Sequence, residues 1–205
     1  MQPLKNQHLP ESSVREEEIL GHAFDLVRES GLSGLTMKKV AERVGFTETA
    51  AYRYFPTKVA LIQALARRLF GPFISTARSI AADTALSPSE RLERVVRQHV
   101  DLIIRTDGLP VLILAEACAG GSEDLLGMMR TGLGNYLGLL ESLLADATPP
   151  GHSVRPEDKA LVLFGISAVI AVRRRLGLEP EASDRIRSDL LPFVVRSLTA
   201  KEGAC

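Results

Sequence analysis

The residues best suited to binding chemistry lie close together, between positions 34 and 58. Five of them are basic and two are acidic, a surplus of three positive charges in a chain of 205 residues whose formal net charge is zero. A local cationic surplus is typical of a surface that meets an anionic partner, whereas the overall charge indicates neither nucleic acid nor membrane. The charged residues of this stretch are Lys38, Lys39, Glu42, Arg43, Glu48, Arg53 and Lys58.

Two predicted short helices position these residues. The first begins after Thr36 as N-cap and ends at Gly45. The second begins after Thr47 and turns only Ala51 and Phe55 inward. Two short helices joined by a glycine-containing turn have the helix-turn-helix shape. The buried face of the first helix is expected to consist of Met37, Val40, Ala41 and Val44.

The second helix gives little to a core, so most of its side chains face outward. An ordinary helical hairpin with a solvated face is the alternative, but two exposed tyrosines and an arginine favour a binding surface. The outward residues are Thr49, Ala50, Tyr52, Arg53 and Tyr54.

From about Glu16 to Leu65 the sequence resembles the TetR (tetracycline-repressor-like) family of transcriptional regulators. Thr49-Ala50 replaces a frequent Gly-Thr pair, and Val59 replaces a common acidic residue, so the base preference stays open. The resemblance rests on Thr36-Met37 with Val40-Ala41, on Gly45-Phe46-Thr47, on Ala51-Tyr52-Arg53-Tyr54-Phe55 and on Thr57-Lys58.

Helical spacing along the chain predicts an all-α fold. The resemblance implies a three-helix helix-turn-helix domain followed by a larger helical domain for ligand binding and dimerisation. The expected boundaries are a flexible arm at 1–11, the DNA-binding domain at 12–56 and the helical domain at 57–205. It also implies a homodimer that binds a palindromic DNA operator, most commonly as a repressor, and is released by a small-molecule effector.

By the same resemblance, residues 47–54 form the recognition helix. Helix N-termini attract phosphate, and side chains in the major groove distinguish bases. Glu48 either stabilises the helix start through the helix dipole or accepts a hydrogen bond from cytosine N4. Lys38 is also predicted to belong to the DNA-binding surface. In the arm, Lys5 and His8 belong to a frayed terminus or reach a minor groove. The expected phosphate contacts are Thr36, Thr47, Tyr52 and Lys58, and the expected base contacts are Thr49, Ala50, Arg53 and Tyr54.

The rest of the chain also has helical spacing and no convincing strand pattern. A capping box at Ser13 and Glu16 predicts a helix that stops at Gly31, and the helix after Thr57 is expected to end at Gly71-Pro72. Pro192 predicts a kink or restart in the last helix. The later helices are predicted near 72–82, 88–106, 110–119, 122–146, 156–176 and 183–200.

The helix at 156–176 is apolar on nearly all sides and must be covered on all of them. We expect a partner subunit to cover one face together with helix 183–200, the alternative being a central core helix of a monomer. The predicted dimer residues are Leu161, Phe164, Ala168, Val172, Leu190, Val194 and Leu198.

The middle helices are expected to hold a pocket for an apolar or amphipathic ligand. Gly127, Thr131, Gly134 and Gly138 form a stripe of small residues, either for close helix packing or for ligand space. The predicted pocket residues are His99, Ile103, Glu116, Cys118, Met128, Tyr136 and Phe164.

Other functional classes lack their sequence signals. Two cysteines make no disulfide framework, and the longest apolar run, Ala160 to Val172, is 13 residues against roughly 20 for a membrane span. We therefore expect a cytoplasmic protein without membrane contact. Four scattered histidines and the lack of a phosphate loop indicate no metal, no cofactor and no enzyme. The remaining rival is a constitutive DNA-bound or protein-interaction factor, which would have a filled core instead of a cavity of a few hundred Å³.

Overall fold

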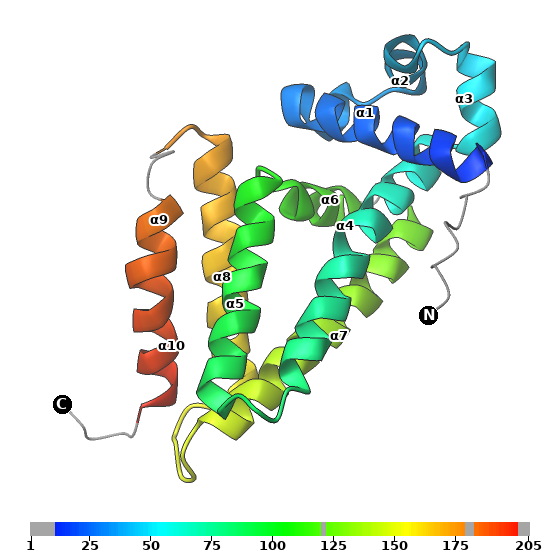
Figure 1. Cartoon of the computed structure of the whole chain (residues 1–205). Coiled ribbons are helices and arrows are strands. Elements are labelled where there is room, and N and C mark those ends of the chain that lie inside the picture. Colours follow the sequence, from blue (N-terminus) through cyan, green and yellow to red (C-terminus); the bar gives the residue numbers. More distant parts are fainter. Residues whose placement is uncertain (1–10, 120–121, 179–182, 201–205) are drawn as a thin grey trace, which may run out of the picture. The chain divides into compact units, whose positions relative to one another are not determined.

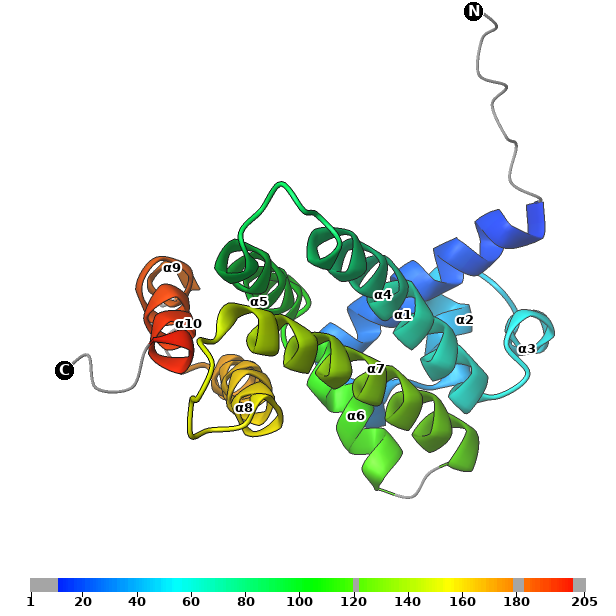
Figure 2. The same ribbon diagram turned by 90° about the horizontal axis from the view of Figure 1, so that it is seen from below.

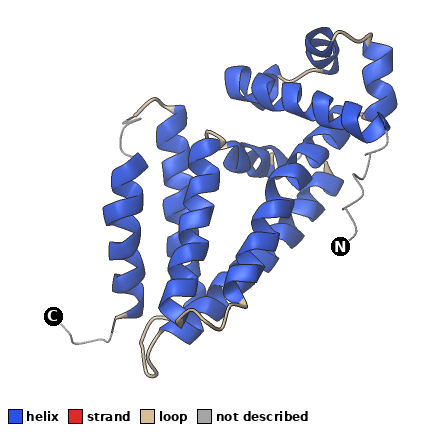
Figure 3. Cartoon of the chain, viewed as in Figure 1, coloured by secondary structure: helices blue, strands red, loops and turns tan. Residues whose placement is uncertain are grey.

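The computed structural model describes residues 11–119, 122–178 and 183–200, and within these ranges it contains helices and no strand (Figure 3). The predicted all-α fold is confirmed. The chain divides into two compact units between Leu65 and Ala66. The arm residues Lys5 and His8 lie outside the described residues.

The N-terminal unit contains α1 (Glu11–Gly34), α2 (Met37–Val44), α3 (Glu48–Tyr54) and the first residues of α4 (Lys58–Ala81) (Figure 1). The predicted start of the first helix is wrong, because α1 begins at Glu11 and Ser13 lies inside it. Gly31 interrupts α1 as predicted, with a φ of 71° that favours glycine.

The predicted break at Gly71-Pro72 is wrong, because α4 is one continuous helix with Pro72 inside it. A proline in a helix interior costs about 3 kcal/mol, since it cannot donate to the carbonyl one turn earlier. The apolar face nevertheless continues past it, with Phe73 and Ala77 buried in the core of the C-terminal unit. Packing of this face outweighs the local penalty.

The C-terminal unit is formed by the rest of α4 and by the following helices. Here α5, α7 and α8 pack against one another, and α10 lies at one edge beside α5 (Figures 1 and 2). The predicted helices agree with α5 to α8 within one residue at each end. The elements are α5 (Pro88–Arg105), α6 (Leu109–Cys118), α7 (Glu123–Ala147), α8 (Pro156–Arg175), α9 (Ser183–Arg185), the π-helical turn η2 (Ile186–Leu190) and α10 (Leu191–Thr199).

The last predicted helix is divided as Pro192 suggests. The π-helical turn ends at Leu190, and α10 starts at Leu191 with the proline in its first turn, where its missing N–H costs no helical hydrogen bond. No helix in the part of the chain that the structure describes is long and apolar enough to cross a membrane.

Candidate nucleic-acid interface and internal cavity

A threonine caps the N-terminus of each of the two short helices in the helix-turn-helix. The Thr36 hydroxyl accepts a hydrogen bond from the Lys39 backbone N–H at 3.2 Å, and the Thr47 hydroxyl accepts from the Ala50 N–H at 3.2 Å. Gly45 ends α2 in the left-handed conformation. Both threonines are exposed, and each hydroxyl still has a proton that can be donated to an anion.

The short helix α3 buries only Ala51, with Phe55 buried immediately after it. Tyr54 differs from the expectation of a fully outward side chain, because it is half-buried and its ring stacks on Phe46 with centroids 6.2 Å apart. Ala50 is half-buried as well. The exposed side chains of α3 are Glu48, Thr49, Tyr52 and Arg53.

Two long-range contacts fix α2 and α4 to α1. The Arg43 guanidinium donates to both carboxylate oxygens of Glu29, at 2.8 and 2.7 Å, and this bond lowers the pKa of Glu29. The Lys58 ammonium donates to the Leu32 carbonyl at 2.8 Å, so part of its hydrogen-bonding capacity is used within the unit. Lys38 is exposed and lies 4.0 Å from Glu42, a pairing that adds little stability.

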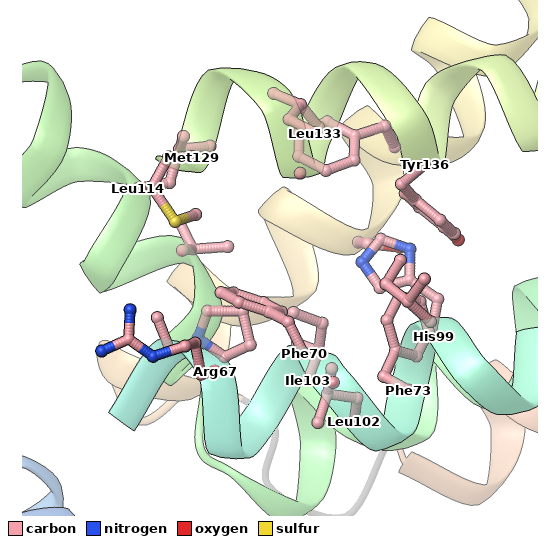
Figure 4. A pocket seen from close by; sticks show the side chains of 18 of the residues that line it. Arg67, Phe70, Phe73, His99, Leu102, Ile103, Leu114, Met129, Leu133 and Tyr136 are labelled. Atoms are coloured by element: carbon pink, nitrogen blue, oxygen red, sulfur yellow. The ribbon is translucent and has the colours of Figure 1, made fainter. Parts of the chain in front are cut away.

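The C-terminal unit contains a cavity of about 680 Å³ (Figure 4). Its wall is mostly apolar and comes from α4, α5, α6, α7 and α8. A volume in this range suits a small organic ligand.

Five of the seven predicted pocket residues line this cavity: His99, Ile103, Met128, Tyr136 and Phe164. The other two, Glu116 and Cys118, do not. The face of α6 that meets the cavity carries Pro110, Val111 and Leu114. Glu116 is two residues beyond Leu114 and so points about 200° away, and Cys118 is exposed at the helix end.

Sequence reasoning missed the whole contribution of α4. It supplies Arg67, Phe70, Phe73, Ile74 and Arg78 to the cavity wall, together with smaller residues. The pocket was expected in the middle helices, and Phe73, Ile74 and Arg78 also lie beyond Gly71, where this helix was expected to end. The available signal was the apolar spacing of residues 66, 70, 73 and 77, which continues across the proline.

The two ends of the cavity differ (Figure 4). At one end, Arg67 is exposed and donates to the Met128 sulfur at 3.9 Å, a weak acceptor. At the other, the buried His99 ring has its centroid 5.0 Å from that of Tyr136 and 5.8 Å from that of Phe164. Burial lowers the pKa of His99 to about 4 and raises the pKa of Tyr136, so both are uncharged near neutral pH.

Among the described residues, the stripe of small residues on α7 neither receives a closely packed helix nor lines the cavity. Gly127 is half-buried, and Thr131, Gly134 and Gly138 are exposed. A Cβ added at any of the three glycines would meet no described atom within 4 Å. None of the four lines the cavity.

The predicted dimer residues fall into three groups. Leu161, Val172 and Leu190 are exposed, as a dimer surface requires. Phe164 and Ala168 line the cavity instead, and Val194 and Leu198 pack half-buried against the core of their own unit. Because each residue is rotated by 100° from the one before it, side chains that are close in sequence lie on different faces of the helix.

Three exposed side chains that the prediction left out extend the outward apolar face: Val162, Val169 (58% exposed) and Phe193 (61%). Val169, Leu190 and Phe193 border an apolar groove of about 850 Å³ between α8 and the η2–α10 segment. Contiguous exposed apolar surface of this kind marks an interaction site.

The helix-turn-helix segment also matches known proteins. A family model for bacterial regulatory proteins of the tetR family matches residues 19–65, which span most of α1, all of α2 and α3, and the start of α4. The class A tetracycline repressor from transposon 1721 of Escherichia coli is 38% identical over 58 residues. Residues 19–65 therefore match the TetR family of bacterial regulatory proteins. Its members are DNA-binding transcriptional regulators and not enzymes.

The TetR relatives are matched over different lengths. The match to the class A repressor covers 28% of this chain and 27% of the repressor, about a quarter of each. A fatty acid metabolism regulator protein of Bacillus subtilis is 23% identical over 135 residues, 66% of this chain and 69% of its own. AibR, solved with isovaleryl coenzyme A and operator DNA, has the same fold, with a TM-score of 0.73 and 21% identity over 87% of this chain and 97% of its own.

Proposed function

We propose that this TetR-family chain is a repressor that binds a palindromic operator as a homodimer and is released by an amphipathic effector in the cavity. The observation that carries the proposal is the 680 Å³ cavity in a chain that also has a helix-turn-helix. A constitutive factor would need no such space, and filling it with larger side chains would add stability. The cavity therefore favours the ligand-responsive reading.

The exposed residues of α3 are assigned to the major groove of the operator. Arg53 is the proposed base-reading residue, since a guanidinium can donate to guanine O6 and N7 together. Thr36, Thr47 and Tyr52 are proposed to position the module on phosphates, with Lys58 adding a charge nearby. Tyr54, held against Phe46, is assigned a supporting place at the edge of this surface.

The homodimer is proposed to form through the outward apolar face of α8 and α10. A single helix-turn-helix contacts few base pairs, and dimers bind two half-sites about one helical turn apart. The exposed side chains available for this contact are Leu161, Val162, Val169, Val172, Leu190 and Phe193.

The effector is proposed to be a fatty-acyl derivative, such as an acyl coenzyme A. The wall is mostly apolar, as an acyl chain requires, and the exposed Arg67 provides a cation for an anionic group at one end. The names of the Bacillus regulator and of the AibR complex point to the same class of molecule. Because α4 begins in the N-terminal unit and lines the cavity, it is the proposed route of coupling. The effector can shift DNA affinity only by its differential affinity for the two states.

A gel-shift titration against the DNA that flanks the protein's own gene tests this function, at two salt concentrations. Wild-type protein should bind saturably and more weakly at high salt, because phosphate contacts release counterions. Arg53→Ala should lose specific binding, while Arg94→Ala, an equal loss of charge at an exposed position of α5, should not. Addition of acyl coenzyme A from isovaleryl to stearoyl should release the DNA at one chain length or more. Operator affinity that no acyl coenzyme A changes would refute the effector assignment.

A further inference from the structure

The inner end of the cavity contains three hydrogen-bonding side chains in an otherwise apolar wall. His99 and Ser167 are buried, and Tyr136 is buried beside them. The remaining polar wall residues, Arg67, Ser75 and Arg78, are exposed. This polar end is therefore distinct from the solvent-accessible cations.

The hydrogen bond between His99 and Ser167 leaves one nitrogen of the imidazole without a partner among the described residues. The Ser167 oxygen lies 3.3 Å from His99 Nδ1 and 3.3 Å from the Leu163 carbonyl oxygen, and a serine has one proton to donate. If the proton goes to Leu163, the imidazole donates through Nδ1 and its Nε2 is an acceptor. If it goes to Nδ1, Nε2 carries the proton and is a donor. In both cases Nε2 has no partner among the described residues.

Tyr136 adds a second unused group. Its hydroxyl is buried and has no hydrogen-bond partner within the described part of the chain. A buried polar group without a partner costs about 1–3 kcal/mol, so an apolar wall would be more stable with phenylalanine here. The two residues come from α5 and α7, line the same cavity and have ring centroids 5.0 Å apart, so they belong to the same end of it.

We propose that His99 and Tyr136, with Ser167 as the positioning residue, bind an uncharged oxygen, a hydroxyl or carbonyl, at the buried end of the effector. This inference rests on the proposed function, because it requires the cavity to hold an effector. The effector is then an apolar chain with an anionic group toward Arg67 and an oxygen at its far end. A chain that ends in a methyl group leaves both polar groups unpaired. An ionised far end would be buried against neutral partners, at a greater cost.

Competition for a fluorescent probe tests the proposal in the full chain. The probe is 1-anilinonaphthalene-8-sulfonate, and the competitors are n-alkanoic acids and ω-hydroxyalkanoic acids of matched lengths from C8 to C14. At the length that spans the cavity, wild-type protein should bind the hydroxy acid at least as tightly as the alkanoic acid. His99→Leu should shift the affinity ratio about tenfold toward the alkanoic acid, because the hydroxyl loses its partner. Tyr136→Phe should shift it in the same direction.

Val154→Ala is the control, since Val154 is exposed and lies outside the cavity wall and should leave the ratio unchanged. Melting-temperature shifts with the same acids provide a second readout. If both acids bind but neither His99→Leu nor Tyr136→Phe changes the ratio at any length, the inference is wrong while the ligand-responsive function stands. If no acid binds and no acyl coenzyme A affects the operator complex, both are wrong.

Discussion

Replacing Tyr136 by phenylalanine should stabilise the ligand-free protein. The substitution removes one buried oxygen that has no partner among the described residues, and it keeps the ring that packs 5.1 Å from Phe73 and 5.0 Å from His99 between centroids. Relief of an unsatisfied buried hydroxyl is worth about 1–3 kcal/mol. In a chain of this length 1 kcal/mol corresponds to roughly 2–4 °C in melting temperature, so Tyr136→Phe should melt roughly 2–12 °C higher.

Differential scanning calorimetry of the full chain without ligand measures this difference. Tyr52→Phe is the matched control, because the Tyr52 side chain is exposed and should change stability by less than about 0.5 kcal/mol. A melting temperature of Tyr136→Phe below that of wild type would refute the reasoning, since it would show that the hydroxyl is hydrogen-bonded in solution.

Three further predictions follow from the same structure. Thr47→Ala should lower the free energy of unfolding by about 1 kcal/mol and weaken operator binding, while Thr47→Ser should keep both, as measured by thermal melts and gel shift. Because burial holds the pKa of His99 near 4, the unfolded chain binds a proton below pH 6.5 that the folded chain does not. The free energy of unfolding should thus fall by up to about 3 kcal/mol between pH 6.5 and 4. In denaturant titrations over this range, His99→Leu should show a smaller fall, because it lacks this contribution. Phe193→Asp should give a monomer by light scattering, while Val154→Asp, another exposed apolar position, should not; a dimeric Phe193→Asp would place the interface elsewhere.

The helix-turn-helix could be predicted from the sequence because its signals are local. Thr36 and Thr47 cap helices within three residues of themselves, and Gly45 takes a backbone conformation that few other residues adopt. The continuity of α4 across Pro72 could not be predicted in this way. It depends on the burial of Phe73 and Ala77 against segments distant in the sequence.

The cavity residues were partly predictable, for a related reason. His99 and Tyr136 stand out as polar groups on apolar helices, and both line the cavity. Glu116 and Cys118 have the same sequence signal, but the rotation of α6 about its axis turns them away. That rotation is fixed by the packing of Leu109, Ile113 and Ala117, which a single helix does not reveal.

Helix α8 shows why apolar character alone cannot assign function. Its apolar residues have three destinations: Leu163 and Ile170 are in the core, Phe164 and Ala168 reach the cavity, and the outward face is exposed. Each step of one residue rotates the side chain by 100°, so neighbours such as Leu163 and Phe164 serve different purposes while sharing one composition. The sequence predicts that α8 needs cover on all sides, and its outward face is exposed in the part of the chain that the structure describes. In the proposed function, an effector covers the cavity face of α8 and a partner subunit covers its outward face. A helix in contact with both would transmit a change at one face to the other.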